Sequence, residues 1–194
     1  MKIILIGNKA QHGKDTFANM LQEELLRRGE ICGIIHFADF LKFICKEYYS
    51  WDGEKNQEGR TLLQEVGNKM RELDEHFWTD FVARFIRHAD HDFILIPDWR
   101  HQEEYERLLE YFDYKDIITV NIMRFVDENT PYVNEAMTEE QRNHKSEIDL
   151  DGYICHYTIL NITLDELQES ASAFAEELSP TKTYEMTLTI GENI

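Results

Sequence analysis

Residues 3–16 read Ile3-Ile4-Leu5-Ile6-Gly7-Asn8-Lys9-Ala10-Gln11-His12-Gly13-Lys14-Asp15-Thr16. A short apolar run leads into a polar loop that contains glycine, and a helical pattern follows. This order of strand, loop and helix is typical of a phosphate-binding loop, the P-loop. Its backbone N–H groups and the N-terminus of its helix form an electropositive cradle for phosphate groups. The stretch therefore predicts a nucleotide-binding site, with an ordinary strand–turn–helix corner as the alternative interpretation.

Two positions depart from the usual P-loop pattern, which is Gly, four residues, then Gly-Lys-[Ser/Thr]. Asn8 stands at the first glycine position, and Asn tolerates left-handed backbone better than most residues. Asp15 follows Lys14, and a carboxylate there can still serve Mg²⁺, which prefers oxygen ligands. We expect Lys14 to reach the β- and γ-phosphates and Thr16 to lie near a phosphate or the metal. The loop residues expected to hold the nucleotide are Asn8, Lys9, Ala10, Gln11, His12, Gly13, Lys14, Asp15 and Thr16.

The charge of the chain favours a small ligand over a nucleic acid. The chain has 194 residues and a formal net charge of -18. Such a surface repels a nucleic-acid backbone, whose binding relies on clustered Lys and Arg. Residues 1–30 are less acidic, with five Lys/Arg and four Asp/Glu. We expect small-molecule nucleotides as partners and no nucleic acid, although the acidity also fits a role in solubility alone.

Length and cysteine usage predict one cytoplasmic domain. The length suggests a single domain, with room for a mobile subdomain. Cys32, Cys45 and Cys155 have no paired spacing, which is typical of reduced thiols in a cytoplasmic protein. The apolar start at Ile3 is too short for a signal peptide, and no apolar run is long enough to span a membrane. We expect no membrane association, and the oligomeric state stays open, with a homodimer as one option.

Apolar runs and helical patterns alternate along the chain. Strands are expected at 2–6, 33–37, 92–97 and 116–123, and within 153–161. Helices are expected at 14–28, after Ala38, over 60–87 with one break, near 101–113 and over 163–178. This alternation implies right-handed crossovers and a parallel sheet. The sequence therefore predicts an α/β three-layer sandwich, with about five parallel strands between helices on both faces.

We expect residues 1–180 to form this single domain and residues 181–194 to form a C-terminal tail. Weak alternation at 182–190 fits either an edge strand or a loose end.

The helical segment 60–87 has two distinct faces. One face carries Arg60, Gln64, Gly67 and Arg71, and another, at core spacing, carries Leu63, Val66, Met70 and Leu73. A glycine between two arginines lets a ligand approach closely, and Arg binds phosphate bidentately. This segment therefore predicts an acceptor site for a monophosphate, with Trp78 at the pocket wall. A solvated face with an incidental glycine is the alternative.

Charged side chains follow the second and third predicted strands. Asp39 is best interpreted as a helix N-cap, and Lys42 faces either the phosphates or solvent. Asp98 and Arg100 come at the sheet edge where α/β proteins bind ligands. We expect Asp98 to hold Mg²⁺ through water or to accept the proton of an attacking oxygen, and Arg100 to meet a phosphate. A cap of the following helix is an alternative role for Asp98, and the two roles are compatible.

Residues 125–146 form a long polar segment, which is typical of a lid or of a mobile loop. Arg124, Arg142 and Lys145 are the cations expected to close over phosphates. Phosphoryl transfer needs such cations because the charge on the transferring group must be stabilised with water excluded. A mobile acidic loop is the alternative, since acidic residues outnumber basic ones here.

Five motifs, in order, resemble those of the deoxynucleoside monophosphate kinases of bacteriophage type, a branch of the P-loop kinases. The motifs are residues 8–16, Phe37-Ala38-Asp39-Phe40-Leu41-Lys42, Leu63-Gln64-Glu65-Val66-Gly67-Asn68-Lys69-Met70-Arg71 with Trp78, Asp98-Trp99-Arg100, and His144-Lys145-Ser146-Glu147. In the first motif, Asn8 replaces Gly and His12 replaces Ser, whereas Asp15 matches the family. The resemblance covers residues 1–168.

The resemblance implies a P-loop kinase that uses ATP and Mg²⁺ to phosphorylate a deoxynucleoside monophosphate. It implies catalytic roles for Lys14, Asp98, Arg124 and Arg142, and metal contacts from Asp15, Thr16 and Asp98. The implied substrate-binding residues are Asp39, Lys42, Arg60, Gln64, Gly67, Arg71, Trp78, Arg100 and Glu147. Two alternatives stay open: a P-loop kinase for another small phosphorylated metabolite, and a nucleotide-binding module without catalysis.

Overall fold

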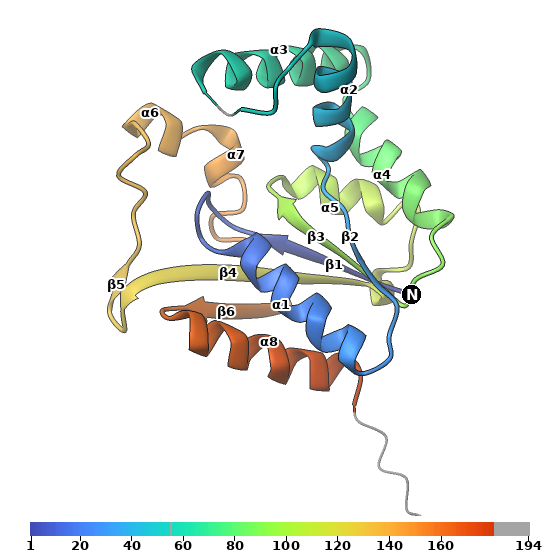
Figure 1. Ribbon diagram of the computed structural model, residues 1–194, viewed down its shortest axis with the longest axis vertical. Helices are drawn as coiled ribbons and strands as arrows, with labels where there is room; N and C mark the ends of the chain where they lie inside the picture. Colours follow the sequence, from blue (N-terminus) through green and yellow to red (C-terminus); the bar gives the residue numbers. More distant parts are fainter. Residues whose placement is uncertain (55, 181–194) are drawn as a thin grey trace, which may run out of the picture.

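The structure, a computed structural model, describes residues 1–54 and 56–180. Five strands form a parallel sheet in the order β2-β3-β1-β4-β6 (Figure 1). They are β1 (Lys2–Gly7), β2 (Cys32–Ile34), β3 (Phe93–Trp99), β4 (Ile117–Asp127) and β6 (Tyr157–Asn161). The predicted α/β fold with a parallel sheet is therefore confirmed, whereas the tail expected at 181–194, with its edge strand, lies outside the described residues.

Helices cover both faces of the sheet. Helices α1 (Lys14–Arg27) and α8 (Leu164–Leu178) lie side by side on one face. On the other face lie α4 (Phe77–Arg87) and α5 (Gln102–Leu108), and η1 (Tyr114–Asp116) leads into β4. Helices α2 (Asp39–Tyr49) and α3 (Gln57–Leu73) pack together beyond the sheet, at the top of Figure 1. None of the helices in the described ranges has the length and apolar character needed to cross a membrane.

The central strand β1 is buried on both faces, as its unbroken apolar run predicts. Ile4 and Ile6 belong to the core cluster with α1 and α8, whereas Ile3 and Leu5 belong to the cluster with α4. All four side chains are fully buried. This burial fixes β1, and with it the loop that follows Gly7.

Several element ends differ from the expected ones. Strand β2 ends at Ile34 instead of residue 37, because the N–H groups of His36 and Phe37 bond to the carboxylates of Asp39 and Asp98. Helix α5 ends at Leu108, short of 113, and turns follow it. Strand β4 extends beyond 123 to Asp127 and pairs antiparallel with β5 (Thr130–Pro131). The segment expected as a lid therefore begins as a β-hairpin.

The capping role predicted for Asp39 was wrong, and so was the capping role weighed as an alternative for Asp98. Ala38, not Asp39, holds the N-cap position of α2, and the Asp39 carboxylate instead accepts a hydrogen bond from the N–H of His36. Helix α5 has His101 at its N-cap, so Asp98 does not cap the helix that follows it. Its carboxylate binds the chain entering α2 instead.

The connection from β4 to β6 contains only short helices. Within residues 128–156, all of which are described, the helices are α6 (Glu139–Arg142) and α7 (Lys145–Ile148). One side of β4, which carries Asn121, Met123 and Phe125, therefore has no long helix packed over it. A cavity lies there instead.

Candidate active site

The loop between β1 and α1 has the backbone conformation that its sequence predicts. Asn8 and Gln11 have positive φ angles of 122° and 63°, and Gly13 has a φ of 93°. Asn8 thus occupies a backbone region that favours glycine, in agreement with its place in the motif. A Cβ atom on Gly13 would lie 2.4 Å from Nδ2 of Asn161, so this position needs glycine for its contacts as well as its φ angle.

Lys14 is buried at the start of α1, with 6% of its surface exposed. Its Nζ atom donates hydrogen bonds to the backbone oxygens of Asn8, at 2.7 Å, and Lys9, at 2.8 Å. Burial, and next the positive charge of Arg100, lower the pKa of Lys14 to about 8. The ammonium group is therefore held at the loop in surroundings where an added anion would stabilise its charge.

Side chains from three other segments anchor the loop. Nζ of Lys9 forms an ion pair with Asp151 at 3.0 Å, and Nδ2 of Asn8 donates to Oδ1 of Asn121 at 2.6 Å. Nδ2 of Asn161 donates to the backbone oxygen of His12 at 2.9 Å. These contacts fix both ends of the loop to the carboxyl edge of the sheet.

His12 packs the loop against β4. Its Nδ1 atom lies 3.3 Å from the backbone oxygen of Ile122 and 3.3 Å from the backbone nitrogen of Arg124. Burial lowers the pKa of His12, so the imidazole is neutral at pH 7. His12, which stands where the resembling family has Ser, therefore acts in this structure as an anchor of the loop.

A chain of four charged side chains links α1 to α2. Nε2 of His36 lies 2.8 Å from Oδ1 of Asp15, and its Nδ1 lies 3.2 Å from Oδ2 of Asp39. Nζ of Lys42 lies 3.0 Å from the other oxygen of Asp39. Hydrogen bonds to Asp15, then to Asp39, raise the pKa of His36 to about 9. Lys42 therefore bonds to Asp39 within this chain of side chains. The sequence had left it facing either the phosphates or solvent, and its partner in the structure is this carboxylate.

Asp98 receives two backbone hydrogen bonds at the end of β3. Its Oδ1 accepts from the N–H of Phe37 at 2.9 Å and its Oδ2 from the N–H of Ala38 at 3.1 Å. Burial raises the pKa of Asp98, while the charge of His36 opposes that change. The charge of Asp98 also acts to raise the pKa of Lys14, against the larger effect of burial.

The side chain of Glu147, on α7, contacts the phosphate-binding loop. Its Oε2 accepts a hydrogen bond from the backbone N–H of Ala10 at 2.7 Å, and its Oε1 pairs with the guanidinium of Arg100. Arg100 also donates to the backbone oxygen of Ser146 at 3.1 Å. The Glu147 carboxylate therefore binds the N–H of Ala10, which is one of the loop amides available to an anion. It also binds Arg100, the side chain expected to contact a phosphate.

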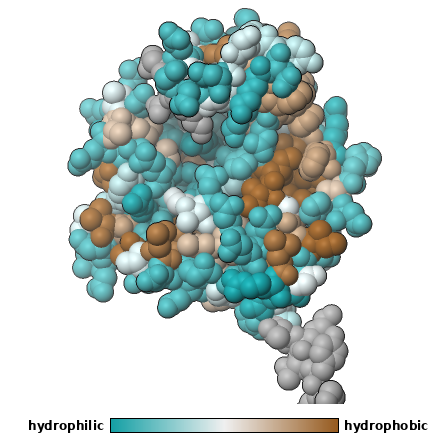
Figure 2. Space-filling view, viewed as in Figure 1, coloured by the Kyte–Doolittle hydropathy of each residue, from teal (hydrophilic) through white to brown (hydrophobic). Residues whose placement is uncertain are grey.

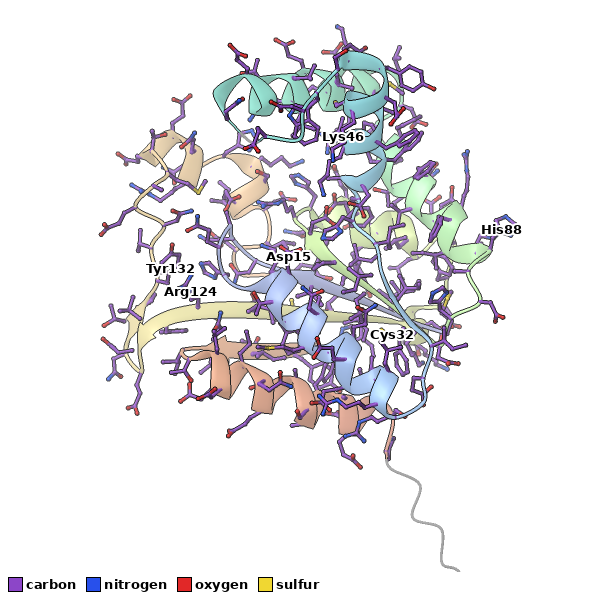
Figure 3. All side chains as sticks on the ribbon, in the orientation of Figure 1. Asp15, Cys32, Lys46, His88, Arg124 and Tyr132 are labelled. Atoms are coloured by element: carbon purple, nitrogen blue, oxygen red, sulfur yellow. The ribbon has the colours of Figure 1, made fainter. Side chains whose placement is uncertain are left out.

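The two arginines of the expected lid differ in their surroundings. The guanidinium of Arg124 lies over the Tyr132 ring, 4.3 Å from its centroid, and donates to the backbone oxygen of Gln11 at 3.0 Å (Figure 3). Tyr132 donates its hydroxyl hydrogen bond to Gln11 Oε1 at 2.7 Å. Arg142 instead bonds to backbone oxygens of its own segment, those of Asn134 and Met137. Only Arg124 of the two touches the loop.

The expected acceptor face of α3 is partly used for helix packing. A Cβ atom on Gly67 would lie 3.3 Å from Cδ2 of Leu41 on α2, and the backbone oxygen of Gly67 accepts from Nε1 of Trp78 at 3.2 Å. Trp78 is only 5% exposed. Gln64 and Arg71 are exposed, and the charge of Arg71 acts on Glu104 near the end of β3. The side chain of Arg60 lies outside the described part of the structure.

Two cavities flank the loop. The smaller, about 360 Å³, is lined by Gln11, Gly13, Lys14, Asp15, Thr16, Arg124, Asn161, Ile162 and Leu164. The larger, about 710 Å³, is lined by residues 7–10, by the free side of β4 and by side chains between residues 131 and 155. Figure 2 shows a largely hydrophilic face that is hollowed between α3, at the top, and the sheet. The loop thus separates one cavity on its C-terminal half from another on its N-terminal half.

Residues 1–54 and 56–180 contain no group of three or more His, Cys, Asp and Glu side chains arranged to hold a metal. Asp15, Thr16 and Asp98 nevertheless supply oxygen atoms around the loop. Mg²⁺ in nucleotide sites is bound by one or two protein carboxylates, by waters and by substrate phosphates. Asp15 and Thr16, which line the smaller cavity, fit that mode of binding, whereas both oxygens of Asp98 already accept backbone hydrogen bonds.

Sequence reasoning missed several residues of the site: His36, Glu104, Asn121, Tyr132, Asp151 and Asn161. Asn161 ends a predicted parallel strand, and Asn121 interrupts an apolar one, so each carried a usable signal. His36 immediately precedes the Phe37–Lys42 motif and is not part of it. Glu104 stands three residues after the N-cap of α5, where a Glu is typical of a capping box, whereas Asp151 carried no local signal because its partner, Lys9, is distant in the chain.

The chain matches no protein-family model and no curated protein. It is similar in structure to the APS kinase CysC of Mycobacterium tuberculosis. A cysteine-to-alanine mutant of that kinase gives a TM-score of 0.44 at 12% identity, over 90% of this chain and 96% of the other. The same kinase in complex with AMPPNP and APS gives 0.42 at 14% identity, over 90% and 97%.

A third solved structure, the tunicamycin resistance protein of Deinococcus radiodurans, gives a TM-score of 0.43 at 15% identity, over 89% of this chain and 94% of the other. All three share little sequence with this chain, so its own residues must identify its ligands.

Proposed function

We propose that this protein is a nucleotide kinase that transfers the γ-phosphoryl group of ATP to a deoxynucleoside monophosphate. The observation that carries the proposal is the Lys14 ammonium, buried at the N-terminus of α1 and bonded to the carbonyls of Asn8 and Lys9. A buried cation with a lowered pKa, beside a cradle of backbone N–H groups, suits a polyphosphate.

ATP binds in the smaller cavity on this proposal. The loop from Gln11 to Thr16 contributes backbone N–H groups to the phosphates, and Lys14 contributes its charge. Asn161, Ile162 and Leu164, at and after the end of β6, line the same cavity at the side where the nucleoside would lie. Arg124 reaches the cavity from β4 and is placed to neutralise charge as the phosphoryl group moves.

The acceptor phosphate binds on the opposite side of Lys14. Arg100 is the main contact, because its guanidinium lies beside the loop and acts on Lys14. Arg71 and Gln64 approach from α3, and Arg60 keeps the acceptor role that the sequence predicts for it. Arg142 approaches from segment 125–146, which acts as the lid of the single domain 1–180. Catalysis consists mainly of positioning and charge stabilisation, as in other phosphoryl transfers.

Asp15, Thr16 and Asp98 hold Mg²⁺ on this proposal, directly or through water. When bound, the ion neutralises charge on the phosphoryl oxygens. Asp98 is held rigidly by the N–H groups of Phe37 and Ala38, and Asp15 is oriented by His36. Asp39 and Lys42 support the same region through His36 and do not need to touch the substrate.

The proposal is tested by measuring ADP release with ATP, Mg²⁺ and each common deoxynucleoside monophosphate in turn, and by measuring ATP binding separately. Release that requires one acceptor supports the kinase and identifies its base. Measurable ATP binding with no release overturns it. In that case a panel of other phosphorylated metabolites distinguishes a different kinase from a module without catalysis.

A further inference from the structure

We propose that the larger cavity binds the base and sugar of the acceptor nucleotide, on the side of the P-loop that faces β4 and away from α3. This inference rests on the proposed function. It adds the free side of β4 as a wall of the site, which no motif in the sequence indicates, and it names Asn121 as a residue that chooses the base.

Helix α3 has no aromatic residue in its sequence to stack on a base. Trp78 has its ring packed edge-on against Phe77, with centroids 4.8 Å apart, and its Nε1 is used by Gly67. The space in front of the Gly67 Cα atom is filled by Leu41. The exposed side chains on this face, Gln64 and Arg71, suit the phosphate better than the base.

The larger cavity has the size and lining of a nucleotide site. Its volume, about 710 Å³, falls within the roughly 300–1,000 Å³ of small-molecule sites. Apolar and aromatic side chains form much of its wall: Trp99, Met123, Phe125, Tyr132, Leu150 and Tyr153. Tyr153 packs edge-on against Trp99, with centroids 5.2 Å apart, which holds both rings in place. Such a wall suits a planar ring.

The charge of the wall suits an anion. Four cations line the cavity, Lys9, Arg100, Arg124 and Arg142, against two carboxylates, Glu147 and Asp151. This local excess of positive charge stands out in a chain with a net charge of -18. A ligand that combines an aromatic ring with a phosphate therefore matches both parts of the lining.

The position of the cavity suits an acceptor. Asn8, Lys9, Ala10 and His12 line it, whereas Gln11 and residues 13–16 line the cavity proposed for ATP. Lys14 lies between the two sides, because its Nζ bonds to the carbonyls of Asn8 and Lys9. A phosphate beside Arg100 would thus sit next to the loop, with its base directed under the lid.

Asn121 is placed to read the base. It lines the cavity, and its Oδ1 accepts from Asn8. Its Nδ2 donates no hydrogen bond within the described residues, so this group is available to an acceptor atom on a base edge. We assign Asn121 as a specificity residue, whose replacement changes the ranking of bases.

The test measures binding of each of the four common deoxynucleoside monophosphates by calorimetry, without ATP. Met123→Trp and Val133→Trp each add a bulky ring to the cavity lining, from β4 and from an exposed loop respectively. Val126→Trp is the matched control, since Val126 is on the same strand, is 66% exposed and does not line the cavity. Binding of a non-hydrolysable ATP analogue and the melting temperature are measured for all variants.

We expect both cavity variants to weaken monophosphate binding by about tenfold or more, as overpacking of a filled site does. Binding of the ATP analogue stays unchanged, and the control binds both ligands normally. Monophosphate binding that is unchanged in a folded cavity variant overturns the pocket, as does a wild type that binds none of the four. Val133 lies in an exposed loop, so its variant decides the matter if Met123→Trp does not fold.

The outcomes separate the pocket from the kinase. Turnover that persists in Val133→Trp with an unchanged KM for the acceptor overturns the pocket and leaves the kinase intact. Binding that depends on the cavity, without any phosphoryl transfer in the wild type, overturns the kinase and leaves the pocket intact.

Discussion

Nε2 of His36 lies 2.8 Å from Oδ1 of Asp15, so a side chain two positions after β2 is bonded to the first turn of the P-loop helix. The same ring bonds to Asp39 at the start of α2. These hydrogen bonds raise the pKa of His36 to about 9, and the bridge is therefore charged at neutral pH. The orientation of a proposed metal ligand thus depends on a histidine that is bound at both of its nitrogens.

His36→Gln should flatten the pH dependence of stability. The folded-state pKa of about 9 lies above the ordinary value of 6.5, so the bridge contributes fully below about pH 6.5 and is lost as pH rises through 9. The wild type should lose up to roughly 3 kcal/mol from this group over that interval, and the variant should not. Urea unfolding at several pH values measures the difference. His88→Gln, at an exposed position, is the control, and parallel curves for His36→Gln and wild type would show that the bridge contributes nothing.

Glu104→Gln should stabilise the protein at alkaline pH. Glu104 is buried and accepts hydrogen bonds from the backbone N–H groups of Arg100 and His101, and burial raises its pKa to about 8. Because the folded pKa is raised, the wild type loses stability as pH rises from about 4.5 through 8. Glutamine keeps the acceptor without the charge.

The melting temperature of Glu104→Gln at pH 9 should exceed that of the wild type, by about 2–4 °C for each kcal/mol gained. Glu106→Gln, exposed on the same helix, should leave it unchanged. A variant less stable than the wild type at pH 9 would contradict the assignment of a costly buried carboxylate.

Asp98→Ala should loosen the chain entering α2. The substitution leaves the N–H groups of Phe37 and Ala38 without their acceptor, which costs about 1–3 kcal/mol. Hydrogen exchange at these two amides should become faster than in the wild type. Asp90→Ala, at an exposed position, is the control. Unchanged hydrogen exchange at Phe37 and Ala38 would show that Asp98 does not stabilise this segment. Kinase activity of the same variant measures the contribution of Asp98 to catalysis.

Lys14→Ala should abolish turnover and preserve the fold. The loss should be about 10²-fold or more, as for other groups that stabilise charge in a transition state. Removal of a buried ammonium with a lowered pKa should not lower the melting temperature. Lys69→Ala, at an exposed position on α3, is the control. A folded Lys14→Ala protein with full activity would show that the loop does not work as proposed.

The parts of the fold that are local in sequence were predictable. The run from Ile3 to Ile6 is buried on both faces, and the positive φ of Asn8 agrees with its place in the motif. Both follow from short-range rules on periodicity and backbone preference. The break between α3 and α4, near Asp74, is equally local and was also found.

The site depends on partners that the sequence does not bring together. Helix α5 is the helix that follows Asp98 in the chain. The Asp98 carboxylate nevertheless accepts hydrogen bonds from the amides of Phe37 and Ala38, some sixty positions earlier. The larger cavity exists because the crossover after β4 has no long helix over Met123. Strand pairing decides both features, and no local pattern encodes them.

The most direct test of the central claim follows the γ-phosphoryl group itself, because ADP release alone also results from hydrolysis. The protein is incubated with γ-labelled ATP, Mg²⁺ and each common deoxynucleoside monophosphate, and the products are separated. The account predicts label in a deoxynucleoside diphosphate, with none formed by Lys14→Ala. Label found only in inorganic phosphate, or remaining entirely in ATP, for every acceptor would contradict it.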